Sequence, residues 1–175
     1  MKTPATWLEE VLGSVAKLDN WLQRQYVGEC LAYERMMTLA KNYELSSKEK
    51  TVLEIIAKDE QKHSSWILKL LLNRQITVPR ISYDEDRYWK ATLTSNMSKD
   101  QLFAIGHHAE DMRLRRIKLL SSDTRVTDDI RTVFGFILKD EKFHSKAFKN
   151  LASKEALTEM AGNHKAGLDA LGLSL

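Results

Sequence analysis

The feature that most constrains this chain is a doubled motif in which a glutamate is followed three residues later by a histidine. Its two copies are Glu60/His63 and Glu141/His144. When the chain is shifted by 81 positions (141 minus 60), residues 19–70 align with residues 100–151 without a gap. We therefore expect two similar halves related by a pseudo-two-fold axis. A site on that axis would receive the same ligands from each half.

Each half contains two segments with the apolar periodicity of an amphipathic helix. The four segments cover about residues 19–43, 46–74, 98–122 and 127–151. Ser46 followed by Glu49 is typical of a capping box, and Ser98 followed by Gln101 marks a third helix start. The sequence therefore predicts four long helices.

The connections between these segments predict how the helices are joined. The first and second segments, like the third and fourth, are only a few residues apart, so each pair should form an antiparallel hairpin. Residues 75–97 make the one long connection and should contain a short helix. Additional short helices are expected at 4–17 and at 153–170, the latter interrupted near Gly162. The expected fold is an all-α, ferritin-like antiparallel four-helix bundle, in one domain over residues 1–175 with its core at 19–151.

Composition excludes several other classes. Hydrophobic residues make up 43% of the chain and charged residues 29%, which suits a packed core and argues against disorder. The only cysteine is Cys30, so a disulfide framework and any Cys-x-x-Cys metal knuckle are excluded. We see no long apolar run and no secretory pattern, so we expect a cytoplasmic protein without a membrane segment. The net charge of +3 is too small to predict nucleic-acid binding.

The doubled motif predicts a metal centre. A glutamate and a histidine at i and i+3 lie on one helix face and can bind the same ion. Two such pairs, with one inward glutamate from each remaining helix, form the ligand set of carboxylate-bridged di-metal sites. The six expected ligands are Glu29, Glu60, His63, Glu110, Glu141 and His144. Four carboxylates balance two divalent ions, for which we expect iron, with manganese possible and zinc as a substitute.

With these motifs, residues 19–151 resemble the rubrerythrin and ferritin-like di-iron superfamily. Gly28-Glu29 followed by Ala32-Tyr33 is similar to its first-helix motif. The resemblance implies that the six residues hold two irons and that the protein is an oxidoreductase activating hydrogen peroxide or dioxygen. It also implies a homodimer. Alternatives within the superfamily are hydroxylation of an organic or tRNA substrate, and iron binding or storage.

Two departures from that family stand out. Rubrerythrins have a further glutamate one turn along the third helix, where this chain has Arg113. They also usually have a rubredoxin domain that delivers electrons, which Cys30 alone cannot build. With these departures, the resemblance implies a separate electron-donor protein. They argue against peroxide reduction by the rubrerythrin route.

Several residues beside the expected ligands allow two interpretations. Asp59 and Asp140 precede the motif glutamates and would either accept a hydrogen bond from a ligand histidine on the neighbouring helix or lie on the surface. His107 would be an added ligand, a proton donor or a hydrogen-bonded core residue. Tyr33 would hydrogen-bond a ligand carboxylate, be oxidised by a reactive intermediate, or pack in the core. Arg113 would pair with a site glutamate or belong to a basic face that is solvated or docks an acidic partner or RNA.

Overall fold

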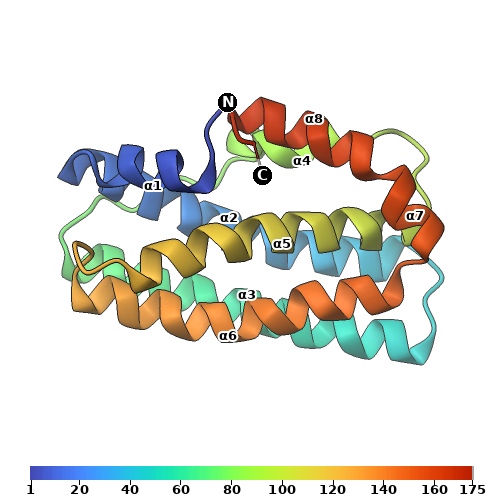
Figure 1. The fold of residues 1–175 in the computed structure, drawn as a ribbon. Helices are drawn as coiled ribbons and strands as arrows, with labels where there is room; N and C mark the ends of the chain where they lie inside the picture. The colour runs from blue at the N-terminus through green and yellow to red at the C-terminus, as the bar shows by residue number, and fades with distance from the viewer. Residues whose placement is uncertain (175) are drawn as a thin grey trace.

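Four long helices form the body of the protein. The computed structural model describes residues 1–174, apart from the side chain of Glu85, and this part is helical without strands. The long helices are α2 (Val15–Asn42), α3 (Ser47–Asn73), α5 (Lys99–Ser122) and α6 (Asp128–Leu151). In Figure 1, α2 lies along α3 and α5 along α6. The all-α, ferritin-like bundle expected from the sequence is confirmed.

Local capping explains where these helices begin. The side chains of Ser46 and Ser98 each accept a hydrogen bond from the backbone N–H of the third helical residue. The side chains of Glu49 and Gln101, at that third position, accept a hydrogen bond from the backbone N–H of Ser46 and Ser98, so both capping boxes are present. Thr127 makes no such cap at α6. Its hydroxyl instead accepts a hydrogen bond from Arg74 at the end of α3.

Two boundaries differ from the sequence expectation. The helix expected at 4–17 ends early, because α1 covers Pro4–Leu12 and Ser14 then caps the start of α2 at Val15. The expected interruption of the C-terminal segment is present, but it lies at Met160, between α7 (Lys154–Glu159) and α8 (Ala161–Leu171), two residues before Gly162. Gly162 lies in the first turn of α8.

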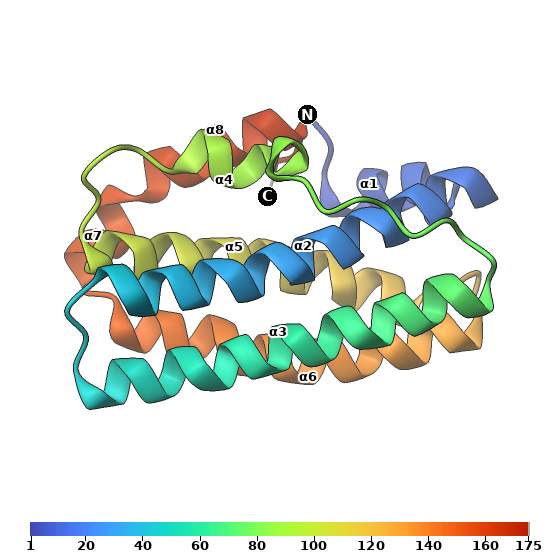
Figure 2. The same cartoon turned by 180° about the vertical axis from the view of Figure 1, so that it is seen from behind.

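The long crossover contributes to a cover over the α2 and α5 side of the bundle. It contains η1 (Tyr83–Glu85) and α4 (Arg87–Thr92), and α4 packs on α8. Figures 1 and 2 show α1, α4 and α8 on the side of α2 and α5 that faces away from α3 and α6. Helices α4 and α8 approach each other closely, because a Cβ atom on Gly167 of α8 would lie 2.6 Å from Tyr88 and Thr92 of α4.

The apolar core is divided along the bundle. One cluster of buried side chains includes Trp21, Ile67 and Phe134, and a second includes Leu53 and Phe103. The buried glutamates and histidines belong to neither cluster, so polar groups occupy the bundle interior beside them. Among residues 1–174, no helix is long and apolar enough to cross a membrane.

Candidate metal centre

Six buried polar side chains converge in the bundle interior. They come from four helices: Glu29 from α2, Glu60 and His63 from α3, Glu110 from α5, and Glu141 and His144 from α6. The most exposed of them, Glu110, is 8% exposed, and the others are at most 1% exposed. Burying so many ionisable groups is costly unless a compensating charge is present.

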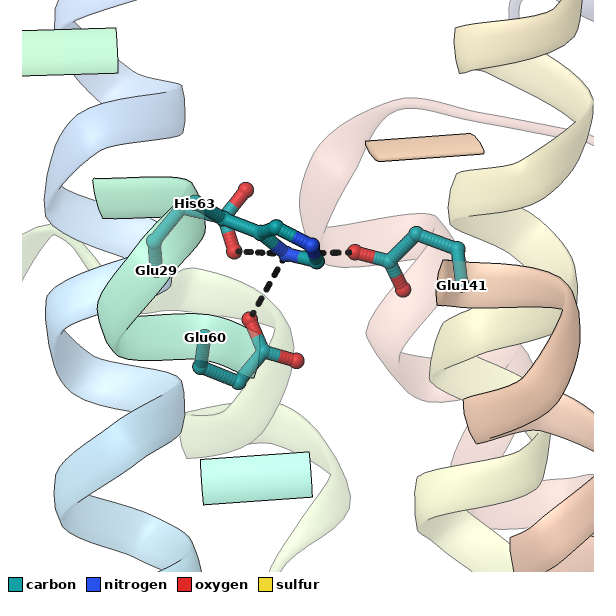
Figure 3. A group of neighbouring side chains, drawn as sticks. All are labelled: Glu29, Glu60, His63 and Glu141. Atoms are coloured by element: carbon teal, nitrogen blue, oxygen red, sulfur yellow. Dashed lines mark ion pairs between the residues drawn. The ribbon is translucent and has the colours of Figure 1, made fainter. Parts of the chain in front are cut away.

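The first half of the cluster surrounds His63, as Figure 3 shows. Its Nδ1 atom lies 3.6 Å from Glu29 Oε2, 3.8 Å from Glu60 Oε2 and 3.7 Å from Glu141 Oε1. Ligand atoms bound about 2.1 Å from one ion lie about 3.0–3.4 Å apart at right-angle or tetrahedral geometry. The four atoms are therefore close enough together to converge on one cation after small adjustments.

The second half repeats this arrangement around His144. Its Nδ1 atom lies 3.3 Å from Glu60 Oε1 and 3.6 Å from Glu141 Oε2. Glu110 completes this second group, whose ligand atoms lie within 4.8 Å of one another, as do those of the first. Glu60 and Glu141 belong to both groups, so these two carboxylates could serve two ions at once.

The donor set fits metal ions. The inner Nδ1 atoms of His63 and His144 form no hydrogen bond with any described residue, although both rings are fully buried. Such unpartnered groups are rare unless an ion or another ligand satisfies them. Carboxylate oxygens with imidazole nitrogens suit iron, manganese or zinc. The cluster is therefore of the kind that holds a metal.

The outer nitrogen of each histidine contacts an aspartate on the opposite motif helix. His63 Nε2 lies 3.1 Å from Asp140 Oδ2, and His144 Nε2 lies 3.2 Å from Asp59 Oδ2. A carboxylate only accepts hydrogen bonds, so each Nε2 carries the hydrogen and, in the neutral ring, leaves Nδ1 with a free lone pair. That lone pair points into the cluster.

Lys62 is a functional candidate that the sequence interpretation missed. Its ammonium lies 2.7 Å from Asp59 Oδ1 and 2.9 Å from Asp140 Oδ2. It therefore links the two aspartates that contact the histidines. The i, i+3 spacing of Asp59 and Lys62 was the available signal, but the contact to Asp140 depends on the packing of α3 against α6.

Arg113 directs its guanidinium into the cluster. It pairs with Glu29, lies 3.3 Å from Glu141 Oε1 and 3.8 Å from Glu60 Oε2, and is 14% exposed. The pairing involves Glu29 of α2, not Glu110, which lies one turn away on its own helix. Arg113 thus supplies positive charge to buried carboxylates in the protein without metal.

Burial and close contact shift the pKa values of the ionisable groups in the cluster. Burial, and then the adjacent Glu141 carboxylate, raises the pKa of Glu110 well above its ordinary value. Burial alone would lower the pKa of His144, but contacts with Glu141 and Glu60 raise it to about 10. Without metal, protons therefore occupy part of the site, and metal ions must displace them.

Two of the candidates beside the cluster lie outside the converging ligand groups. His107 Nδ1 lies 3.0 Å from the carbonyl oxygen of Ser145 and 3.2 Å from its hydroxyl, so the ring bonds to α6. Tyr33 packs against the apolar cluster that contains Met36 and Phe103. Neither residue belongs to a ligand group among residues 1–174.

A cavity of about 740 Å³ lies beside the cluster, between α2, α5 and the cover. Glu110 and Arg113 form part of its wall, which contains no residue of α3. Since the histidines come from α3 and α6, the cavity approaches the cluster from the opposite side. Its volume falls in the range of small-molecule sites.

Comparison with known proteins identifies the family. The family model for rubrerythrin matches residues 20–152, which include all six clustered side chains. Neither the curated proteins nor the solved structures contain a significant match to this chain. The matched region covers most of the 175 residues. The chain belongs to the rubrerythrin family.

Proposed function

We propose that the protein is a di-iron oxidoreductase that reduces hydrogen peroxide or dioxygen. The observation that carries this proposal is the buried set of four glutamates and two histidines, in which both inner imidazole nitrogens lack a hydrogen bond to residues 1–174. Family membership and the donor chemistry favour iron over the other candidate metals. Four carboxylates would neutralise two divalent ions.

Each side chain has a distinct role in this proposal. Glu29 and His63 would hold one ion, and Glu110 and His144 the other, while Glu60 and Glu141 would serve both. Asp140 and Asp59 would fix the orientation and hydrogen position of the two imidazole rings. The apolar clusters on either side would restrict water at the centre.

The bound irons would supply electrons to the oxidant and stabilise its developing negative charge. For peroxide the balance is H₂O₂ + 2e⁻ + 2H⁺ → 2H₂O. Cys30 is the only cysteine of the chain, so a cysteine-ligated electron-transfer iron centre cannot form within it. The electrons would come from a separate donor protein.

A second candidate function is hydroxylation of an organic substrate. The 740 Å³ cavity, which reaches the cluster at Glu110, is the observation that favours it. The balance is R–H + O₂ + 2e⁻ + 2H⁺ → R–OH + H₂O, with the electrons again from a separate donor. A solid bundle would leave no room for such a substrate.

Oxidation of the loaded protein tests the proposal. The protein is filled with Fe²⁺ without oxygen, then titrated with peroxide or with dioxygen while absorption is recorded. We expect one of these oxidants to convert both irons to the ferric state, and Glu141→Ala to abolish this. Bound irons that neither oxidant converts would refute the oxidoreductase proposal.

A further inference from the structure

The wall of the cavity contains a column of charged side chains that ends at the metal cluster. Glu110, Arg113 and Arg116 follow one another at three-residue spacing on α5, and all three line the cavity. The column spans six residues, or about 9 Å along the helix axis. A molecule of that length could therefore contact Arg116 at one end and the cluster at the other.

Arg116 differs from its counterpart in the other half of the internal repeat, Arg35. Arg35 Nη1 lies 2.5 Å from Asp86 Oδ2, and its guanidinium lies over the ring of Trp89. Arg116 lies over the ring of Trp7 but forms no ion pair or hydrogen bond with residues 1–174. The two related arginines thus have similar aromatic neighbours, but among residues 1–174 only Arg35 has a carboxylate partner.

Other cationic side chains lie near Arg116 and add to the positive charge of the cavity wall. Arg24 lines the same cavity, and Arg113 is one turn away on α5. Burial, and then the charges of Arg113 and Arg24, lowers the pKa of Arg116 to about 10, so the guanidinium is charged near neutral pH. A partly buried guanidinium without an anion is unfavourable, and carboxylate and phosphate groups are its best partners.

The carboxylates that line the cavity do not neutralise the Arg116 guanidinium. Glu10 pairs with Lys2, Asp86 pairs with Arg35, and Glu110 belongs to the metal cluster. The rest of the lining includes aromatic rings, among them Trp21 and Tyr88. The cavity therefore combines apolar surface with a guanidinium that has no anionic partner in the described part of the chain, which suits an organic anion.

We propose that this cavity binds a small organic anion, with its carboxylate or phosphate on Arg116 and its carbon body extending toward the metal cluster. The assignment of this anion as the substrate rests on the hydroxylase alternative of the proposed function. Binding of the anion does not depend on turnover. The Arg116 site and the metal chemistry can therefore fail separately.

The test measures binding to the full-length protein, both metal-free and loaded with redox-inactive zinc. The probes are phenyl phosphate, 4-phenylbutyrate, neutral benzamide and inorganic phosphate. Calorimetry and the fluorescence of the cavity tryptophans measure the binding of each probe. We expect at least one organic anion to bind, at least tenfold more tightly than benzamide and than inorganic phosphate. Absence of binding by both organic anions would overturn the proposal.

Variants locate the site. Arg116→Gln should weaken binding of the anion at least tenfold, and Arg116→Lys should restore part of it. The matched control is Arg115→Gln on the same helix, because Arg115 is exposed and pairs with Asp111. Equal affinity in the wild type and Arg116→Gln, in proteins with the same helical circular dichroism, would refute the assignment. Inorganic phosphate binding as tightly as the organic anions would refute the organic ligand.

Fe²⁺ binding and oxidation are measured in parallel on the same variants. If the anion binds through Arg116 but the iron-loaded protein reacts with neither oxidant, the proposed function fails and the anion site stands. If iron reacts normally but no organic anion binds, the anion site fails alone. The two proposals are therefore distinguishable.

Discussion

The Nε2 atom of His63 on α3 lies 3.1 Å from the Oδ2 atom of Asp140 on α6. The related pair, His144 and Asp59, has a separation of 3.2 Å between the same atoms. Each motif helix therefore supplies a candidate metal ligand and the carboxylate that orients the ligand of the other helix. The internal repeat of the sequence has become a reciprocal contact in space.

This reciprocity predicts the effect of removing one carboxylate charge. Asp140→Asn should weaken Fe²⁺ or Zn²⁺ binding 10- to 100-fold, since the outer partner of a ligand histidine fixes its hydrogen position and basicity. Competition with a chelator measures the affinity. Asp111→Asn, on the exposed surface of α5, is the control and should leave it unchanged. Wild-type affinity in Asp140→Asn would show that the aspartate has no such role.

Arg113 provides a prediction of opposite sign. Its guanidinium pairs with Glu29 and lies near Glu141, so it competes with metal ions for these carboxylates. Arg113→Gln should lower the melting temperature of the metal-free protein and increase the rise on loading with zinc. Calorimetric melting with and without zinc measures both. Arg115→Gln is again the control, and a smaller rise in Arg113→Gln than in the wild type would contradict the competition.

We expect His164, which lies away from the cluster, to make the stability of the protein depend on pH. Its Nδ1 lies 2.8 Å from the Tyr88 hydroxyl, and its ring stacks on His108. Burial, and then the charge of His108, lowers the pKa of His164 to about 4. Between the ordinary pKa of 6.5 and about 4, the unfolded chain binds more protons than the folded chain, so stability falls as pH falls.

The expected loss is on the order of 1 kcal/mol, because His164 is only partly buried and water screens the effect. Urea unfolding of the metal-free protein at pH 7 and pH 4.5 measures the loss, and His164→Gln should make it smaller. An unchanged pH dependence in that variant would exclude His164 as the source.

Substitution of Gly167 on α8 tests the packing of the cover, with Gly135 on α6 as the comparison. Beyond its chain neighbours and its own helix backbone, a Cβ atom at Gly135 would meet nothing within 4 Å, whereas at Gly167 it would lie 2.6 Å from Tyr88. Gly135→Ala should stabilise the protein by about 0.5–1 kcal/mol through helix propensity. Gly167→Ala should destabilise it by about 1–3 kcal/mol, since α4 and α8 must separate. Equal stabilities in urea unfolding would contradict the close approach.

The sequence predicted the features that depend on local pattern. Apolar periodicity located the four long helices, and the Ser46 and Ser98 caps located two of their starts. The break before Val15 was missed because the apolar pattern continues through Gly13 and Ser14, while the cap formed by Ser14 decides the boundary. Helix boundaries depend on such single contacts.

Features that depend on tertiary packing could not be predicted from the periodicity or motif spacing of the sequence. Pairing of Arg113 with a site glutamate was one of the interpretations that the sequence left open, but the choice of Glu29 as its partner depends on the packing of α2 against α5. Arg116 was interpreted only as part of a solvated or docking face, yet it lines a cavity. The cavity exists because α4 packs on α8 above α2 and α5, and this contact joins segments far apart in the chain. No periodicity encodes that contact.

Anaerobic Fe²⁺ titration tests most directly whether the six buried side chains bind two metal ions. We expect about two tightly bound Fe²⁺ ions per chain, and loss of both sites in a folded Glu60→Ala, Glu141→Ala double variant. A wild type that binds no Fe²⁺ tightly, or a double variant that binds it as the wild type does, would contradict a di-metal site.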